Sequence, residues 1–262
     1  MYDFTYARPA SVADAKTALA AAGDDGVFLA GGQSLIPALK LRLRRPSTVV
    51  DLSSLSGLDG IAIEGDRLVI GALATHAAVA SSKIVREKLP ALAALAASIG
   101  DPQVRNRGTL GGSIANADPA ADYPAGVVGL DAEVVTDKRT IKADDFFTGM
   151  FETALQPGEI VIAVKFRIPE KAAYAKFPQP ASHFALAGVL VAKFTDGVRV
   201  AVTGAGPSVF RVEAMEKALA KNFGSVALSN ITVPADGLNA DLHADAAYRA
   251  HLIGVLAKRA LG

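Results

Sequence analysis

Two diglycine segments are the part of this sequence best suited to hold a charged ligand. The first, residues 30–35 (AGGQSL), follows a predicted strand and opens a predicted helix, and the second, residues 107–113 (RGTLGGS), repeats its chemistry. Glycine lets the backbone approach a phosphate with no Cβ in the way, and consecutive amides at a helix start form a concave anion site. Hydroxyl donors stand beside both pairs, at Ser34, Thr109 and Ser113. Two such loops suit a diphosphate held from two sides.

Neither loop matches a common nucleotide-binding fingerprint. No GK[ST] follows the first glycine pair, which excludes a Walker loop, and the G-x-G-x-x-G spacing of a Rossmann domain is absent. On its own, a Gly-Gly turn is more often structural. Asn116 and Asp122, which follow the second loop, could bind the ribose or adenine of a nucleotide. Asp118 and Asp122 could instead cap a helix that begins near Pro119.

The other reactive residue types exclude several kinds of site. The chain has no cysteine, so it can hold no cysteine-ligated iron–sulfur cluster or zinc ion, and no thiolate nucleophile. The histidines lack metal-ligand spacing; they are His76, His183, His243 and His251. We therefore predict no metal site and no catalytic side chain. His76 follows a strand and could lie near a bound cofactor, but capping or packing is the simpler interpretation. The basic run at residues 40–45 could meet an acidic partner, but a solvated helix face is the simpler interpretation.

Composition predicts a globular protein without a nucleic-acid surface. About half of the residues are hydrophobic (51%), a fifth are charged (20%), and the formal net charge is only +1. No window offers about 18 uninterrupted apolar residues, so no transmembrane segment is expected. The N-terminus lacks the basic start and apolar run of a secretory signal. These features predict a cytoplasmic protein.

The first glycine loop must be positioned by the elements of the N-terminal region. Residues 1–54 have the pattern strand, helix, strand, glycine loop, helix, strand, with the second helix predicted over residues 33–43. Alternating apolar residues after Gly60 predict a β-hairpin. Residues 89–99, nearly all Ala and Leu, predict a buried helix.

The second glycine loop lies in a stretch with few regular signals, residues 101–122. A helix is predicted over residues 123–130, and two further strands follow it. Residues 169–180 contain three prolines and resemble a domain boundary, after which two antiparallel strands and helices predict a separate α+β unit. The predicted domains are residues 1–54, 55–170 and 171–262.

Both glycine loops belong to longer stretches that resemble a known family. AGGQSLIPALKLRL, from Ala30, and DPQVRNRGTLGGSIANADPAADYPA, from Asp101, occur in the order and spacing typical of that family. They resemble the medium, FAD-binding subunit of the molybdenum hydroxylases, the family of carbon monoxide dehydrogenase and xanthine dehydrogenase medium chains. VIGALATHAAV, PGEIV at residues 157–161 and YAKF from Tyr174 extend the similarity over nearly the whole chain.

The resemblance implies a fold and a role. The family has the α+β, two-subdomain FAD-binding fold shared with vanillyl-alcohol oxidase and the peptidoglycan-precursor reductase. A C-terminal α+β domain, an antiparallel sheet with helices, covers the isoalloxazine. In such complexes a large molybdopterin subunit oxidises the substrate, and a small subunit with two [2Fe-2S] clusters relays electrons to the flavin. The chain is thus expected to be an oxidoreductase subunit that passes electrons through FAD to an external acceptor, within a dimer of heterotrimers.

The family's motifs also assign site residues. They place residues 30–35 and 109–113 at the pyrophosphate, Asp122 near the adenosine end, and Lys176 beside the flavin, where a cation would favour the reduced cofactor. The predicted cofactor-binding residues are Ala30, Gly31, Gly32, Gln33, Ser34, Leu35, Thr109, Leu110, Gly111, Gly112, Ser113, Asn116, Asp122, Lys176 and Phe184.

The sequence departs from the family pattern at three places. Gln33 stands where many relatives have His, and Phe184 stands where carbon-monoxide-oxidising relatives place a Tyr against the ring. Phe184 can still stack but lacks the hydroxyl. Residues 177–180 lack the basic side chains common there. These departures bear on the substrate and the electron acceptor of the complex, and FAD binding does not depend on them.

Two other functions fit parts of the same sequence. A self-sufficient FAD oxidoreductase on this fold would need its own substrate base near the ring, for which His183 is the one candidate. A nucleotide- or phosphate-binding module that has lost the flavin is the second, and the intact motifs at both loops argue against it.

Overall fold

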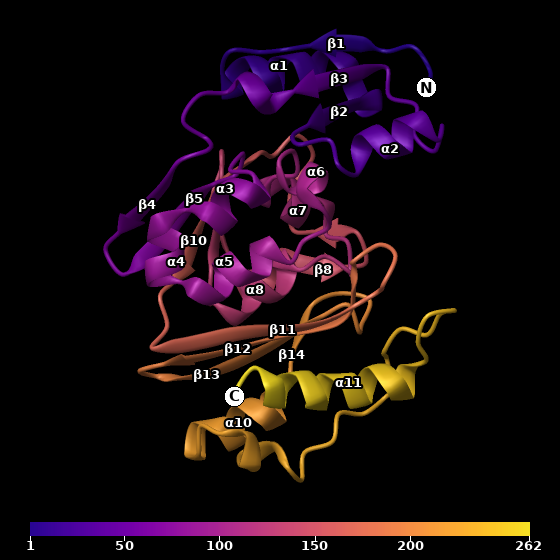
Figure 1. The fold of residues 1–262 in the computed structure, drawn as a ribbon. Coiled ribbons are helices and arrows are strands. Elements are labelled where there is room, and N and C mark those ends of the chain that lie inside the picture. The colour runs from indigo at the N-terminus through magenta and orange to yellow at the C-terminus, as the bar shows by residue number, and fades with distance from the viewer.

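The computed structural model describes all 262 residues, which form three layers stacked along one axis (Figure 1). The layers are built on a three-stranded, a five-stranded and a four-stranded sheet, and a two-stranded ribbon completes the second. The N-terminus lies in the first layer, and the C-terminal helix covers the outer face of the third (Figure 1). None of the helices is both long and apolar enough to traverse a bilayer.

The first layer positions the first glycine loop. Its elements are β1 (Thr5–Ala7), α1 (Val12–Ala22), β2 (Gly26–Leu29), α2 (Leu35–Lys40) and β3 (Thr48–Asp51), with 3₁₀ turns at Gly23–Asp25 and Leu52–Ser54. The strands are parallel in the order β1-β3-β2, so the loop after β2 leaves the carboxyl edge of the sheet. The predicted element order is confirmed. The second helix is shorter than predicted, because the backbone of Arg42 is left-handed and ends it.

The second layer carries the other glycine loop on a mixed arrangement of helices and an antiparallel sheet. Its elements are β4 (Ile61–Glu64), β5 (Arg67–Gly71), α3 (His76–Ser81), α4 (Lys83–Lys88), α5 (Pro90–Ala97), α6 (Pro102–Arg105), α7 (Leu110–Asn116), α8 (Tyr123–Gly129), β6 (Glu133–Thr136), β7 (Thr140–Lys142), α9 (Ala143–Phe146), β8 (Phe147–Gly149), β9 (Glu152–Thr153) and β10 (Val161–Arg167). The sheet order is β4-β5-β10-β6-β7. The predicted β4–β5 hairpin and the buried helix α5 are confirmed.

The expectation of little regular structure over residues 101–122 is wrong. The segment contains α6 and α7, each opened by a side-chain cap. The Asp101 carboxylate accepts from the Val104 N–H, and the Thr109 hydroxyl oxygen accepts from the Gly112 N–H at 3.1 Å. Capping by Asp or Thr replaces the missing partner of a first-turn amide, and this offsets the low helix propensity of the glycines.

The third layer is the predicted antiparallel sheet with helices, and the α+β class is confirmed. Its elements are β11 (Lys171–Pro178), β12 (Ala185–Phe194), β13 (Gly197–Thr203), β14 (Phe210–Arg211), α10 (Glu213–Lys221) and α11 (Ala246–Arg259), with a 3₁₀ turn at Ser225–Leu228. The proline-containing segment predicted as a boundary holds the eight-residue strand β11. That strand lies at the edge of the sheet, and Pro178 is its last residue, so no interior ladder bond is lost.

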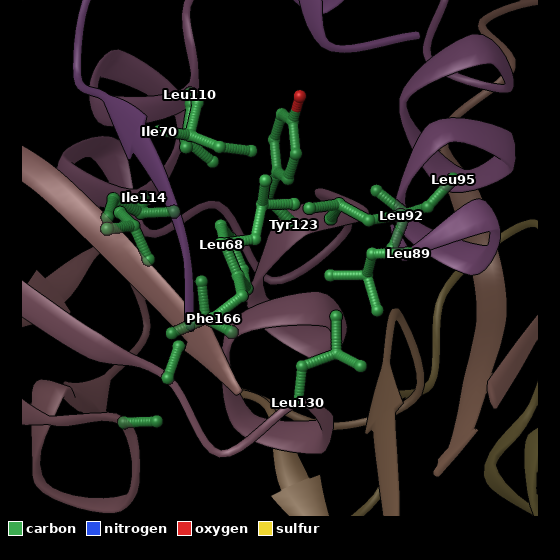
Figure 2. Close-up of a cluster of buried hydrophobic side chains, with 14 of the residues drawn as sticks. Leu68, Ile70, Leu89, Leu92, Leu95, Leu110, Ile114, Tyr123, Leu130 and Phe166 are labelled. Carbon is green, nitrogen blue, oxygen red and sulfur yellow. The ribbon is translucent and has the colours of Figure 1, made fainter. Parts of the chain in front are cut away.

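One core joins the second and third layers, and another lies within the third. In the larger one, the inner face of the third sheet packs on α5 and α8, and Figure 2 shows the leucines of this core around Leu68 and Phe166. The outer face of the same sheet packs against α10 and α11. The domain boundaries predicted at residues 54/55 and 170/171 fall between elements, just before β4 and β11, and they stay predictions.

Candidate functional site

A cavity of about 710 Å³ has walls from all three layers. It is bordered by both glycine loops, by the helices of the second layer, and by residues 182–184 of the third. This volume lies within the range of roughly 300–1,000 Å³ that is usual for ligand and cofactor sites. Of the predicted cofactor-binding residues, all except Leu110 and Lys176 line this cavity.

The first glycine loop presents a row of unpaired amides to the cavity. The backbone N–H groups from Ala30 to Leu35 donate to no acceptor within the protein. The loop bends through Gly32, whose φ of +75° lies in the left-handed region that favours glycine. Most backbone amides in folded proteins are paired, so a run of free ones at the wall of a cavity is suited to an anion.

The two glycine loops touch each other. A Cβ added to Gly31 would lie 1.9 Å from the carbonyl oxygen of Arg107 and 2.8 Å from the Cα of Gly108. A Cβ on Gly112 would lie 3.4 Å from the Cβ of Ala30. Residue 31 must therefore be glycine for the first and second layers to meet at this distance. The expectation that both loops face one ligand is consistent with this contact.

The amides of the second loop are mostly engaged inside the protein. The N–H groups of Leu110 and Gly111 donate to the carbonyls of Ala74 and Ala72 at 3.0 and 2.8 Å, and the Gly112 N–H donates to Thr109 Oγ1. Gly111 is pressed against Ala72, where a Cβ would lie only 2.5 Å from the alanine Cβ. The expectation of a second amide cradle equal to the first is therefore wrong.

Side chains are what the second loop can still offer a ligand. The Thr109 oxygen accepts a hydrogen bond from within the loop, but its own O–H stays available to donate. The hydroxyl of Ser113 and the amide of Asn116 have no partner in the protein, and both residues line the cavity. Leu110 points into the core and not into the cavity (Figure 2).

Asp122 is held in a buried hydrogen-bond network with two residues of β11. Its carboxylate accepts from the hydroxyl of Tyr174 at 2.5 Å and from the ammonium of Lys176 at 2.9 Å, and the side chains of Asp122 and Lys176 are 5% and 7% exposed. Burial raises the pKa of Asp122, while the Lys176 charge and the Tyr174 hydroxyl act to lower it. Asp122 makes no side-chain cap on α8, so the capping alternative for it is wrong.

Lys176 does not line the cavity. Its ammonium also donates to the carbonyl of Ser98 at 3.1 Å, so it is bound between the second and third layers. Asp118, by contrast, lines the cavity and accepts from the Ala120 N–H at 2.9 Å, but this bond closes a turn, because no helix begins near Pro119, and the predicted helix cap is wrong. Burial raises the pKa of Asp118. Lys176 was predicted to lie beside the ligand. In the structure it lies outside the cavity wall and is paired with Asp122, which does line the cavity.

Two exposed aromatic side chains border the cavity. Phe184, a predicted residue, is 48% exposed, and Phe151, which sequence reasoning missed, is 58% exposed. Phe151 and His183 both have left-handed backbones, with φ of 55° and 60°. Strained non-glycine residues cluster at functional sites more than elsewhere. The sequence signal for Phe151 was weak, because nothing local separates it from the two phenylalanines before it.

His76 lies in the cavity wall and does not cap a helix. Thr75 is the cap of α3, with its Oγ1 accepting from the Ala78 N–H at 3.1 Å. His76 is the next residue and is buried. Burial lowers its pKa to about 4, and the charge of Arg105 acts in the same direction, so the imidazole is neutral near pH 7. The basic run of residues 40–45 is largely exposed as expected, although Arg44 lines the cavity.

Comparison with known proteins identifies the family of this chain. Residues 2–171 match the family model described as the FAD binding domain in molybdopterin dehydrogenase. The chain is similar to the carbon monoxide dehydrogenase medium chain of Hydrogenophaga pseudoflava, with 37% identity covering 98% of this chain and 96% of that one. It is also similar to the nicotine 6-hydroxylase medium subunit of Paenarthrobacter nicotinovorans, with 36% identity covering 98% and 95%.

Solved structures agree with the sequence relatives. Reconstituted CO dehydrogenase from Oligotropha carboxidovorans superposes with a TM-score of 0.90 at 33% identity, over 99% of this chain and 96% of that one. Quinoline 2-oxidoreductase from Pseudomonas putida 86 gives a TM-score of 0.89 at 28% identity, over 99% and 96%. The predicted FAD-binding fold with an added C-terminal domain is confirmed.

Proposed function

The chain belongs to the family of FAD-binding medium subunits of molybdopterin dehydrogenases, and from this membership we propose that it is the electron-relaying subunit of such a complex. It is an FAD-binding oxidoreductase subunit. In the proposal, electrons come from [2Fe-2S] clusters of a small partner subunit and leave to an external acceptor. A large molybdopterin subunit would oxidise the substrate, and the complex would be a dimer of heterotrimers.

The residues around the cavity fit FAD. The unpaired amides of residues 30–35 suit the two negative charges of the pyrophosphate, since hydrogen bonds to charged acceptors are the stronger ones. Ser113 and Asn116 would add side-chain donors beside them. Phe151 and Phe184 offer flat apolar surfaces to an aromatic ring system. This free row of amides in a cavity of cofactor size is the observation that carries the assignment of the site.

The chain contributes binding and positioning, and no reactive side chain is required of it. Bound FAD supplies the redox chemistry, because it can accept and release electrons singly or in pairs. Walls from three layers would surround the bound cofactor. The ion pair of Asp122 with Lys176 places a neutralised, buried network next to the cavity. The absence of cysteine requires that any iron–sulfur cluster lie in a partner chain.

Mixing experiments test this role. The FAD-loaded chain would be mixed in a stopped-flow instrument with a reduced [2Fe-2S] partner subunit, and bleaching of the flavin absorbance would be followed. We expect fast reduction by the partner, and none by aldehydes, purines or N-heterocycles when the chain is alone. Direct oxidation of such a substrate by the isolated chain would instead establish a self-sufficient oxidoreductase.

A further inference from the structure

Two unpartnered buried polar atoms lie together beside the cavity. Only three buried side-chain nitrogen or oxygen atoms in the protein lack a hydrogen-bond partner, namely His76 Nδ1, Tyr123 Oη and Arg249 Nε. The rings of His76 and Tyr123 are in contact, with centroids 5.3 Å apart and planes at 52°. Leaving a buried polar group unpaired is costly, so each such group in a native protein requires an explanation.

His76 is fixed in the cavity wall. Its backbone N–H donates to the carbonyl of Gly108 at 2.9 Å, and a Cβ on Gly108 would lie 2.4 Å from His76 Nε2. The imidazole is therefore packed against the second glycine loop, with only 5% of the residue exposed. Nδ1 is fully buried and has no protein partner, whereas Nε2 is not fully buried and makes no hydrogen bond within the protein, so Nε2 is the nitrogen that can face the cavity. Thr75 already caps the helix, so a capping role does not explain the histidine.

The hydroxyl of Tyr123 also lacks a hydrogen-bond partner, but Tyr123 does not reach the cavity. It is fully buried among Leu92, Leu110 and other residues of the larger core, and its hydroxyl points away from the leucines below it (Figure 2). It is not part of the cavity wall. The two rings thus form a pair in which only the histidine can reach a ligand.

We propose that His76 is a cofactor-binding residue whose imidazole donates a hydrogen bond to an oxygen acceptor of the bound FAD. The inference rests on the proposed site, because it requires FAD to occupy this cavity. A neutral imidazole has one N–H donor and one acceptor nitrogen, and FAD offers oxygen acceptors both on its pyrophosphate and on its ring carbonyls. The bound cofactor would supply a partner for Nε2, and this would explain a polar ring at an otherwise apolar contact with Tyr123.

A pair of substitutions at one position separates binding from packing. His76→Leu keeps an apolar side chain of similar size and removes both nitrogens, whereas His76→Gln keeps a donor. We expect the dissociation constant for FAD to rise about tenfold in His76→Leu, equivalent to about 1.4 kcal/mol, and to stay within about threefold in His76→Gln. The thermal midpoint of the His76→Leu apoprotein should be unchanged or higher, because an unpaired buried group is gone.

Tyr123→Phe is the matched control. It removes the neighbouring unpartnered hydroxyl from the same cluster, so the apoprotein should be as stable or more stable, with FAD affinity unchanged. Parallel titrations with ADP, and the visible spectrum of bound FAD, locate the acceptor. An equal loss of ADP affinity places it on the pyrophosphate, and a spectral shift with ADP binding unchanged places it on the ring.

Two results would overturn the inference. Normal FAD affinity in His76→Leu would show that the imidazole makes no bond to the cofactor. A lower apoprotein midpoint in both His76 variants, with weakened binding in both, would show that the residue acts by packing. Failure of the wild-type chain to bind FAD would refute the site itself and is distinguishable from either result.

Discussion

The closest backbone contact at the site predicts the effect of replacing Gly31 by alanine. The added Cβ would meet the Arg107 carbonyl oxygen at 1.9 Å, where the first glycine loop touches the second. Both partners of this clash are backbone, so no flexible side chain can yield. The loops must separate by roughly 1 Å before the contact becomes tolerable, and the first and second layers must separate with them.

The magnitude follows from what this shift does to the amides of residues 30–35. Overpacking of this kind costs about 1–3 kcal/mol of unfolding free energy in the apoprotein. Displacing one or two amides from a charged acceptor costs about 2–4 kcal/mol of binding free energy, which is roughly a 30- to 700-fold rise in the dissociation constant. The loss of FAD affinity should therefore be the larger effect.

The assay is a fluorescence titration of apoprotein with FAD, run beside urea unfolding. Gly254→Ala is the control, because a Cβ there meets nothing within 4 Å in the middle of α11. It should stabilise the chain by about 0.8–1 kcal/mol through helix propensity and leave FAD affinity unchanged. If Gly31→Ala bound FAD as tightly as the wild type, the amides of this loop would not be the pyrophosphate site, and the assignment would be wrong.

Three further substitutions test other parts of the site. Glu159→Gln addresses a buried carboxylate whose pKa is held at about 2, because the bonds from Arg139, Gln156 and Thr136 outweigh the effect of burial. The usual pKa of this carboxyl group is 4.5, so the stabilisation is fully present above pH 4.5 and is lost as the pH falls toward 2. Urea unfolding should show that the variant loses roughly 2–3 kcal/mol of unfolding free energy at pH 7 and little at pH 2. Lys176→Met leaves Asp122 buried without its counter-ion and should cost about 3–5 kcal/mol of unfolding free energy, most of it recovered when Asp122→Asn is added. Phe184→Ala should weaken FAD binding roughly 3- to 10-fold and Phe184→Tyr should not, as measured by the same titration; equal affinity in all three would remove Phe184 from the site.

Local patterns were sufficient to predict much of the fold. Ser11 and Gly23 bound α1 as expected, with the Ser11 hydroxyl accepting from the Asp14 N–H and Gly23 in a left-handed backbone. Alternation correctly predicted the β4–β5 hairpin, and the alanine-rich stretch forms α5. In each case, residues close in sequence carry the interactions that form the element.

Elements stabilised by distant residues were missed or misjudged. Helix α7 has a glycine pair in its first turn and ends at Ala117 in a left-handed backbone, where glycine is the usual residue. Strand β11 forms in a segment with prolines at its margins because the whole length of β12 pairs with it. Long-range pairing of this kind leaves no periodic trace in a short window of sequence.

In the candidate site, too, features set by neighbouring residues were predicted and features set by distant residues were missed. The free amides of the first glycine loop could be predicted, because they follow from a local turn between a strand and a helix. That the amides of Leu110 and Gly111 are hydrogen-bonded within the protein could not be predicted, because their acceptors lie on another segment of the chain. The bonds from Tyr174 and Lys176 to Asp122, and the unpaired nitrogens of His76, are likewise products of tertiary packing.

The division of the cavity among three layers has a consequence for biosynthesis. Val27 and Phe184 both line it, although one is synthesised early and the other late. A nascent chain on the ribosome therefore lacks one wall of the cavity until residues 182–184 have emerged and β12 has paired. The complete cavity therefore forms only after most of the polypeptide has been synthesised.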